Sequence, residues 1–124
     1  MCMKSILLVE DEEALLNILG NILGDEGYEV KKLPVPGEAL RACESYQPDL
    51  IICDVRMAEM DGFALLEKMK ATEKIKNVPF VFLTGFNDSE GKKKGLRLGA
   101  KAYITKPFDV DEFLEKVREI VPLT

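Results

Sequence analysis

The residues best suited to chemistry in this 124-residue chain are three carboxylates, a threonine and a lysine. Glu10 and Asp11 follow one short apolar run, Asp54 follows another, and Thr84 and Lys106 end two later ones. Carboxylates offer hard oxygen ligands to a cation, whereas a hydroxyl and an ammonium group can hold the oxygens of an anion. Histidine is absent, which excludes serine–histidine and cysteine–histidine catalysis and histidine-ligated zinc.

Apolar runs and amphipathic stretches alternate along the chain, and this alternation predicts five strand–helix units. The expected strands are 6–9, 28–31, 49–53, 79–83 and 102–104, and the expected helices are 14–23, 36–45, 63–69, 89–98 and 109–121. Asp109 and Glu112 are expected to form a variant of the capping box at the start of the last helix. Such alternation indicates a parallel sheet with helices on both faces.

The pattern of apolar and polar residues within each strand predicts the order of the strands in the sheet. The first, third and fourth runs are continuously apolar, as is typical of central strands buried on both faces, whereas the second alternates and the fifth is short. The expected fold is therefore an α/β, flavodoxin-like, doubly wound five-stranded parallel sheet of order 2-1-3-4-5 in a single domain.

This order brings the reactive residues together, because open α/β sheets bind ligands at the carboxyl ends of their strands. Glu10, Asp11 and Asp54 would repel one another there unless a cation compensates, and an all-oxygen donor set suits Mg²⁺. Thr84 and Lys106 would face the same crevice and supply donors to a phosphoryl group. Taken singly, each residue is more typical of a loop acid, a strand-end cap or a surface lysine; the joint placement favours a site.

Composition excludes several other classes. The net charge of −5 argues against a general nucleic-acid surface and against a polybasic membrane anchor. No apolar run has the length of a signal peptide core or a membrane span. Cys2, Cys43 and Cys53 form no C-x-x-C pair, so free thiols in a reducing cytoplasm are expected, with Cys43 and Cys53 in the core.

Five short motifs in order along the chain resemble the receiver domain of two-component response regulators. They are Glu10-Asp11, Asp54, Met60-Asp61-Gly62, Thr84-Gly85 and Lys106-Pro107-Phe108. The resemblance covers essentially residues 1–124 as one receiver domain and implies a phosphoacceptor switch in a phosphorelay.

The resemblance assigns the acceptor and the metal ligands. Asp54 would accept the phosphoryl group from a phosphohistidine on a sensor histidine kinase or a phosphotransfer protein. The Mg²⁺ cofactor would be held by Asp11 directly, by Glu10 through water, by Asp54, and by the main-chain carbonyl of Arg56.

The resemblance also assigns the switch. Thr84 and Lys106 would bind the phosphoryl oxygens, and Thr84 with Tyr103 would carry the conformational change. The Lys106–Pro107 peptide bond is expected to be cis. A protein of this kind is not an enzyme beyond catalysing its own phosphorylation and dephosphorylation.

The same resemblance suggests partners and a location. A cytoplasmic location and a downstream effector or missing output domain are expected, with no nucleic acid or membrane bound by this segment. A homodimer through the helix at 89–98, the strand at 102–104 and the helix at 109–121 is compatible with it. The chain is expected to be either a stand-alone regulator or an excised part of a larger protein.

Some residues depart from the family pattern. Ala58 stands where proline is usual, which leaves that loop less rigid. Arg56 and Phe86 flank the path of the attacking water, and we hypothesise that their bulk prolongs the phosphorylated state. Gly91 and Gly95 weaken the helix at 89–98, whose lysines 92–94 form either a solvated face or a partner-docking surface.

Three alternatives stay open. The first is a receiver-like interaction domain that works without phosphorylation. The second is a haloacid-dehalogenase-type phosphatase, which would need an aspartate where Arg56 stands. The third is a flavin-binding electron carrier, whose phosphate the acids at 10–13 would repel.

Overall fold

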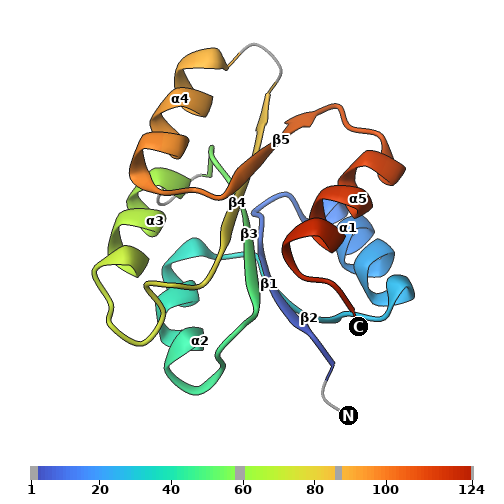
Figure 1. Ribbon diagram of the computed structural model, residues 1–124, viewed down its shortest axis with the longest axis horizontal. Helices are drawn as coiled ribbons and strands as arrows, with labels where there is room; N and C mark the ends of the chain where they lie inside the picture. Colours follow the sequence, from blue (N-terminus) through green and yellow to red (C-terminus); the bar gives the residue numbers. More distant parts are fainter. Residues whose placement is uncertain (1–2, 58–60, 86–87, 124) are drawn as a thin grey trace.

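The sheet has the predicted fold and strand order. In the computed structural model, which describes residues 3–57, 61–85 and 88–123, the parallel strands lie in the order β2-β1-β3-β4-β5 (Figure 1). Their bounds are β1 (Ser5–Val9), β2 (Glu29–Leu33), β3 (Leu50–Asp54), β4 (Phe80–Gly85) and β5 (Ala102–Lys106). The three continuously apolar runs form the three central strands, which confirms the prediction made from their apolar pattern.

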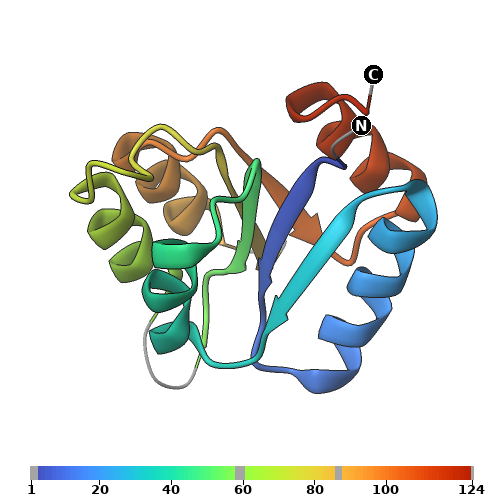
Figure 2. The same cartoon turned by 90° about the horizontal axis from the view of Figure 1, so that it is seen from below.

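Helices cover both faces of this sheet. They are α1 (Glu13–Glu26), α2 (Ala39–Ser45), α3 (Gly62–Lys70), α4 (Ser89–Leu98) and α5 (Val110–Ile120). Figures 1 and 2 show α1 and α5 on one face and α2, α3 and α4 on the other. No helix in the described part of the chain has the length and apolarity needed to cross a membrane.

Two helical boundaries differ from the prediction by more than one residue. The helix expected over 36–45 is wrong in its first turn, which is the 3₁₀ helix η1 (Pro36–Glu38) before α2. Proline has no N–H and glycine has low helix propensity, so Pro36 and Gly37 favour a short tight turn. Helix α1 continues past 23 and ends at Gly27, whose φ of 112° lies in the left-handed region that glycine adopts readily.

The expected capping box of the last helix is also wrong. Asp109 occupies the N-cap of α5, but its side chain makes no capping hydrogen bond. Asp111 and Glu112 in the first turn instead place negative charge at the positive end of the helix dipole. Side-chain caps are present at α3, where Asp61 accepts from Ala64 N at 2.9 Å, and at α4.

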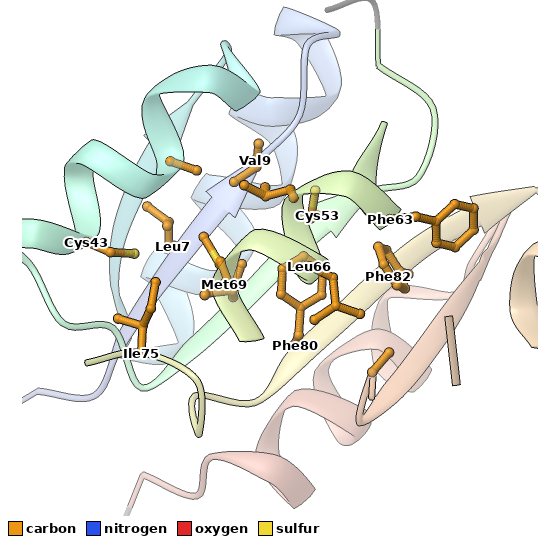
Figure 3. Packing of buried hydrophobic residues seen from close by; sticks show 14 of the residues in the cluster. Leu7, Val9, Cys43, Cys53, Phe63, Leu66, Met69, Ile75, Phe80 and Phe82 are labelled. Atoms are coloured by element: carbon orange, nitrogen blue, oxygen red, sulfur yellow. The ribbon is translucent and has the colours of Figure 1, made fainter. Parts of the chain in front are cut away.

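The apolar core lies in two layers, one on each face of the sheet. Figure 3 shows the layer on the face of the sheet that α2 and α3 cover, where Val9, Cys53 and Phe82 belong to one buried cluster with Leu66 and Met69. The other layer joins the sheet to α1 and α5. As expected, Cys43 and Cys53 are buried free thiols; Cys2 lies outside the described residues.

A glycine lets α3 begin close to the end of β3. A Cβ atom at Gly62 would lie 2.6 Å from the main-chain oxygen of Asp54 and 2.8 Å from the ring of Phe82. Any larger residue would therefore push α3 away from the strand that carries Asp54.

Candidate functional site

The register of the sheet assembles the predicted residues at one edge. Val9 is paired with Cys53, so the next residues, Glu10 and Asp54, lie side by side. Asp54 is paired with Leu83, which places Thr84 one residue further along the neighbouring strand.

Lys106 reaches the same edge from the outermost strand. It is paired with Gly85 in β4, and the expected cis peptide bond between Lys106 and Pro107 is present. The carboxyl-terminal ends of β1, β3, β4 and β5, which were predicted to form the site, therefore lie next to one another.

A lysine bridges the two buried carboxylates. Lys106 Nζ lies 2.8 Å from Asp54 Oδ2 and 3.5 Å from Glu10 Oε1. The main chain contributes two further donors: Glu12 N to Glu10 Oε2 at 3.1 Å, and Arg56 N to Asp54 Oδ1 at 3.3 Å. The ammonium group thus offsets part of the repulsion between the acids.

The cluster perturbs the acidity of its members. Burial, reinforced by Asp54, raises the pKa of Glu10 to about 7, against a backbone hydrogen bond and Lys106, which lower it. Burial alone would lower the pKa of Lys106, but its hydrogen bond to Asp54 and the charges of both acids leave that pKa raised. Burial, together with nearby negative charge, raises the pKa of the Cys53 thiol well above its ordinary value, so this thiol is a poor nucleophile.

A pocket is lined by Asp54 together with other residues of the site. It has a volume of about 470 Å³, and the residues that line it are Asp54, Val55, Arg56, Thr84, Gly85, Asp88 and Lys106. Acid, hydroxyl and ammonium groups therefore face one solvent-connected space large enough for a phosphoryl group and its water.

The chemistry of the donors fits a magnesium ion. Glu10 Oε1 is buried and accepts no hydrogen bond among the described residues, although Lys106 Nζ lies 3.5 Å away, and the carboxylates of Glu10 and Asp54 offer the oxygen ligands that Mg²⁺ prefers. The side chain of Asp11 is exposed, however, and no three acidic or thiol side chains in the described ranges gather closely enough to hold a metal ion as they stand. The convergence of Asp11 with Glu10 and Asp54 around one ion stays a prediction.

The two predicted switch residues are on adjacent strands. Thr84 is buried, but its hydroxyl donates to Asp88 Oδ2 at 3.2 Å instead of to Asp54. Tyr103 on β5 is half-buried against the core, and Lys92 Nζ lies 5.0 Å from the centroid of its ring. The hypothesis about phosphoryl lifetime involves Phe86, which lies outside the described residues, as do Ala58 and Met60.

Asp88 is the site residue that sequence reasoning missed. It lines the pocket, contacts Thr84 and lies 3.6 Å from Arg56 Nη2. The pair Asp88-Ser89 before a helical stretch signals an N-cap, but it does not show that this cap faces the site.

The sequence matches the family model for the response regulator receiver domain over residues 6–118. The chain belongs to this family. It is a receiver domain of two-component response regulators, which are phosphoacceptor switches, and thus a signalling domain and not a metabolic enzyme.

Similar proteins support this assignment. The chain is 33% identical to the DNA-binding dual master transcriptional regulator RpaA of Synechocystis, over 98% of this chain and 51% of that protein. It is 30% identical to the polar-differentiation response regulator DivK of Brucella ovis, over 93% and 94%. This receiver domain thus spans about half the length of some curated relatives and nearly all of others.

Solved structures show the same fold. Chemotaxis protein CheY4 of Vibrio cholerae superposes with a TM-score of 0.90 at 29% identity, covering 97% of this chain and all of that one. A response regulator structure from Chloroflexus aurantiacus has a TM-score of 0.91 at 31% identity, covering 96% and 98%.

Proposed function

We propose that Asp54 is the phosphoacceptor of this receiver domain and that residues 1–124 act as one switch unit. The single observation that carries the proposal is the carboxylate of Asp54 in the lining of the pocket, 2.8 Å from Lys106 Nζ. The main-chain N–H of Arg56 donates to the other oxygen of this carboxylate at 3.3 Å.

The receiver-domain family implies that the donor is a phosphohistidine on a histidine kinase or a phosphotransfer protein. The donor histidine lies on another protein, because this chain has no histidine of its own. A carboxylate oxygen of Asp54 attacks the phosphorus atom in line, the P–O bond forms, and the P–N bond to the donor imidazole breaks. The imidazole leaves with the bonding electrons and takes up a proton. Lys106 then moves part of its hydrogen bonding from Asp54 to the equatorial phosphoryl oxygens and offsets their charge.

We place the magnesium site on Glu10, Asp11 and Asp54 with the main-chain carbonyl of Arg56. A bound Mg²⁺ would supply charge neutralisation at the phosphoryl oxygens. Oε1 of buried Glu10 accepts no hydrogen bond among the described residues and has Lys106 Nζ 3.5 Å away, and this supports the assignment, since a second cation would further stabilise the buried acids.

The switch pair would be Thr84 and Tyr103. Once the phosphoryl group is present, the Thr84 hydroxyl has a stronger, anionic acceptor, and its movement frees space beside the half-buried Tyr103 on β5. The outward face of α4, β5 and α5 would then bind an effector, an output domain or a second copy in the cytoplasm.

Mass spectrometry of the intact protein tests this function. Incubation with acetyl phosphate and Mg²⁺ should add one phosphoryl group to the wild type and none to Asp54→Ala. Asp25→Ala, which removes an exposed acid on α1, is the matched control and should be modified like the wild type. Equal modification of the wild type and Asp54→Ala would refute the assignment and favour an interaction domain that works without phosphorylation at Asp54.

A further inference from the structure

The geometry points to Asp88 as a positioning residue that holds the Thr84 hydroxyl away from Asp54 until a phosphoryl group arrives. This inference rests on the proposed function, because it assigns a resting partner to the threonine that would bind the phosphoryl group. We call the Thr84–Asp88 hydrogen bond the latch.

The latch joins the switch residue to the start of α4. Thr84 Oγ1 donates to Asp88 Oδ2 at 3.2 Å, while Asp88 Oδ1 accepts from Gly91 N at 3.0 Å and caps the helix. The Asp88 carboxylate therefore accepts a hydrogen bond from β4 with one oxygen and from α4 with the other. The side chain of Asp88 is only 16% exposed, so water competes weakly for these bonds.

The carboxylate of Asp88 is held firmly in this place. Its main-chain N–H donates to Gly85 O and its carbonyl accepts from Lys92 N, both at 3.1 Å. A Cβ atom at Gly91 would collide with this carboxylate, so the position of the acid depends on the glycine. Arg56, which is mostly exposed, lies 3.6 Å from the same oxygen that accepts from Thr84.

The latch opposes phosphorylation for a simple reason. The Thr84 hydroxyl has a single proton to donate, so it cannot bond to Asp88 and to a phosphoryl oxygen at once. Phosphorylation must therefore break the latch, and the broken bond leaves one oxygen of the α4 cap without its partner. Occupancy at Asp54 is thereby coupled to the first turn of α4.

Removing the acceptor while keeping the helix cap tests the latch. Serine is as good an N-cap as aspartate, but its short side chain does not extend to a second acceptor oxygen at the position of Oδ2. Asp88→Ser should raise the initial rate of phosphorylation by acetyl phosphate and Mg²⁺ about three- to tenfold, which corresponds to releasing one hydrogen bond. Asp61→Ser makes the same change at the cap of α3 and should leave the rate unchanged.

A double-mutant cycle separates the latch from simple charge repulsion. Thr84→Val removes the hydroxyl, so most of the gain from Asp88→Ser should disappear in that background. Thr84→Ser keeps the hydroxyl and should restore the gain. An undiminished gain in the Thr84→Val background would show that Asp88 acts through its charge alone and would overturn the latch.

Gly91→Ala is an independent variant, because it displaces the Asp88 carboxylate without removing it. Like Asp88→Ser, it should increase the initial rate of phosphorylation, and again only when residue 84 carries a hydroxyl. A wild type that gains no phosphoryl group would refute the proposed function and the latch together. A wild type that is phosphorylated at the same rate as Asp88→Ser would refute the latch alone.

Discussion

At the scale of single residues, Lys106 already provides the positive charge that the buried acids need in the resting protein. Its ammonium group contacts both Asp54 and Glu10 from the outermost strand of the sheet. In the proposed function the same group would neutralise phosphoryl oxygens, so resting stability and reactivity would both depend on one side chain.

Substitution of Lys106 should separate these roles from metal binding. We expect Lys106→Ala to slow phosphorylation by acetyl phosphate by about 10²-fold, the usual cost of losing one preorganised charge donor. Binding of Mg²⁺ should not weaken, because the lysine is a competitor of the cation and not a ligand. Lys101→Ala, at an exposed lysine before β5, is the control. A variant with weakened Mg²⁺ binding in a magnetic resonance titration would contradict this division.

The pH dependence of the folding stability should show the effect of burying the phenol of Tyr28. Its hydroxyl donates to the main-chain oxygen of Val121 at 2.7 Å, and burial raises its pKa above the ordinary value of 10.0. In the unfolded chain the phenol ionises near pH 10, whereas in the folded protein it stays neutral to higher pH. Its contribution is therefore complete below pH 10 and is lost as the pH rises through the folded-state pKa.

Tyr28→Phe tests this sign. We expect the variant to be less stable by about 1 kcal/mol at pH 8, because the Val121 carbonyl loses its donor. Urea denaturation above pH 10 should show the difference between the two proteins narrowing, since only the wild type loses the tyrosine contribution. A constant difference across this range would show that Tyr28 titrates alike in both states.

At the scale of secondary-structure elements, two glycines inside helices should respond in opposite ways to the same substitution. Gly62→Ala should destabilise the fold by about 1–3 kcal/mol, because its Cβ would overlap Asp54 O and Phe82. Gly24→Ala should stabilise it by roughly 0.5–1 kcal/mol, because nothing lies within 4 Å of a Cβ there and alanine favours the helix. Thermal or urea denaturation measures both, and a destabilised Gly24→Ala would contradict the reasoning.

The elements were predictable where burial decides the pattern. Continuous apolar runs marked β1, β3 and β4 as central, and strand ends then located Asp54, Thr84 and Lys106 correctly at one edge. The η1 turn was not predicted from the sequence. Pro36 and Gly37 disrupt only the first turn, and the apolar spacing of Ala39, Leu40 and Cys43 that indicated the helix lies beyond them.

The sequence did not allow the orientation of the side chains at the site to be predicted. Whether Thr84 turns to Asp54 or to Asp88 depends on where α4 begins after β4, and no local pattern specifies that position. The pairing of Lys106 with both acids likewise requires the three-dimensional register of β1, β3 and β5.

At the scale of the whole molecule, metal binding should stabilise the fold through linkage. A ligand that binds only the folded state at ten times its Kd adds about 1.4 kcal/mol to the free energy of unfolding. We expect Mg²⁺ to raise the urea midpoint of the wild type and to have little effect on Asp11→Asn, while Asp25→Asn behaves like the wild type. An equal response of Asp11→Asn would remove this residue from the proposed ligand set.

The position of β3 in the middle of the sheet determines how far a signal must travel. Adjacent strands are about 4.8 Å apart, so the effect of the proposed phosphorylation at Asp54 would cross only β4 before it reached Tyr103 on the outermost strand, a path of roughly 10 Å. In the opposite direction, only β1 separates β3 from β2, the other outermost strand, so the two paths are equally long. The two outermost strands therefore lie equally far from β3 but behind different neighbours: β4, toward β5, carries the hydroxyl of Thr84 near its carboxyl end, whereas β1, toward β2, is followed by the acids Glu10 and Asp11.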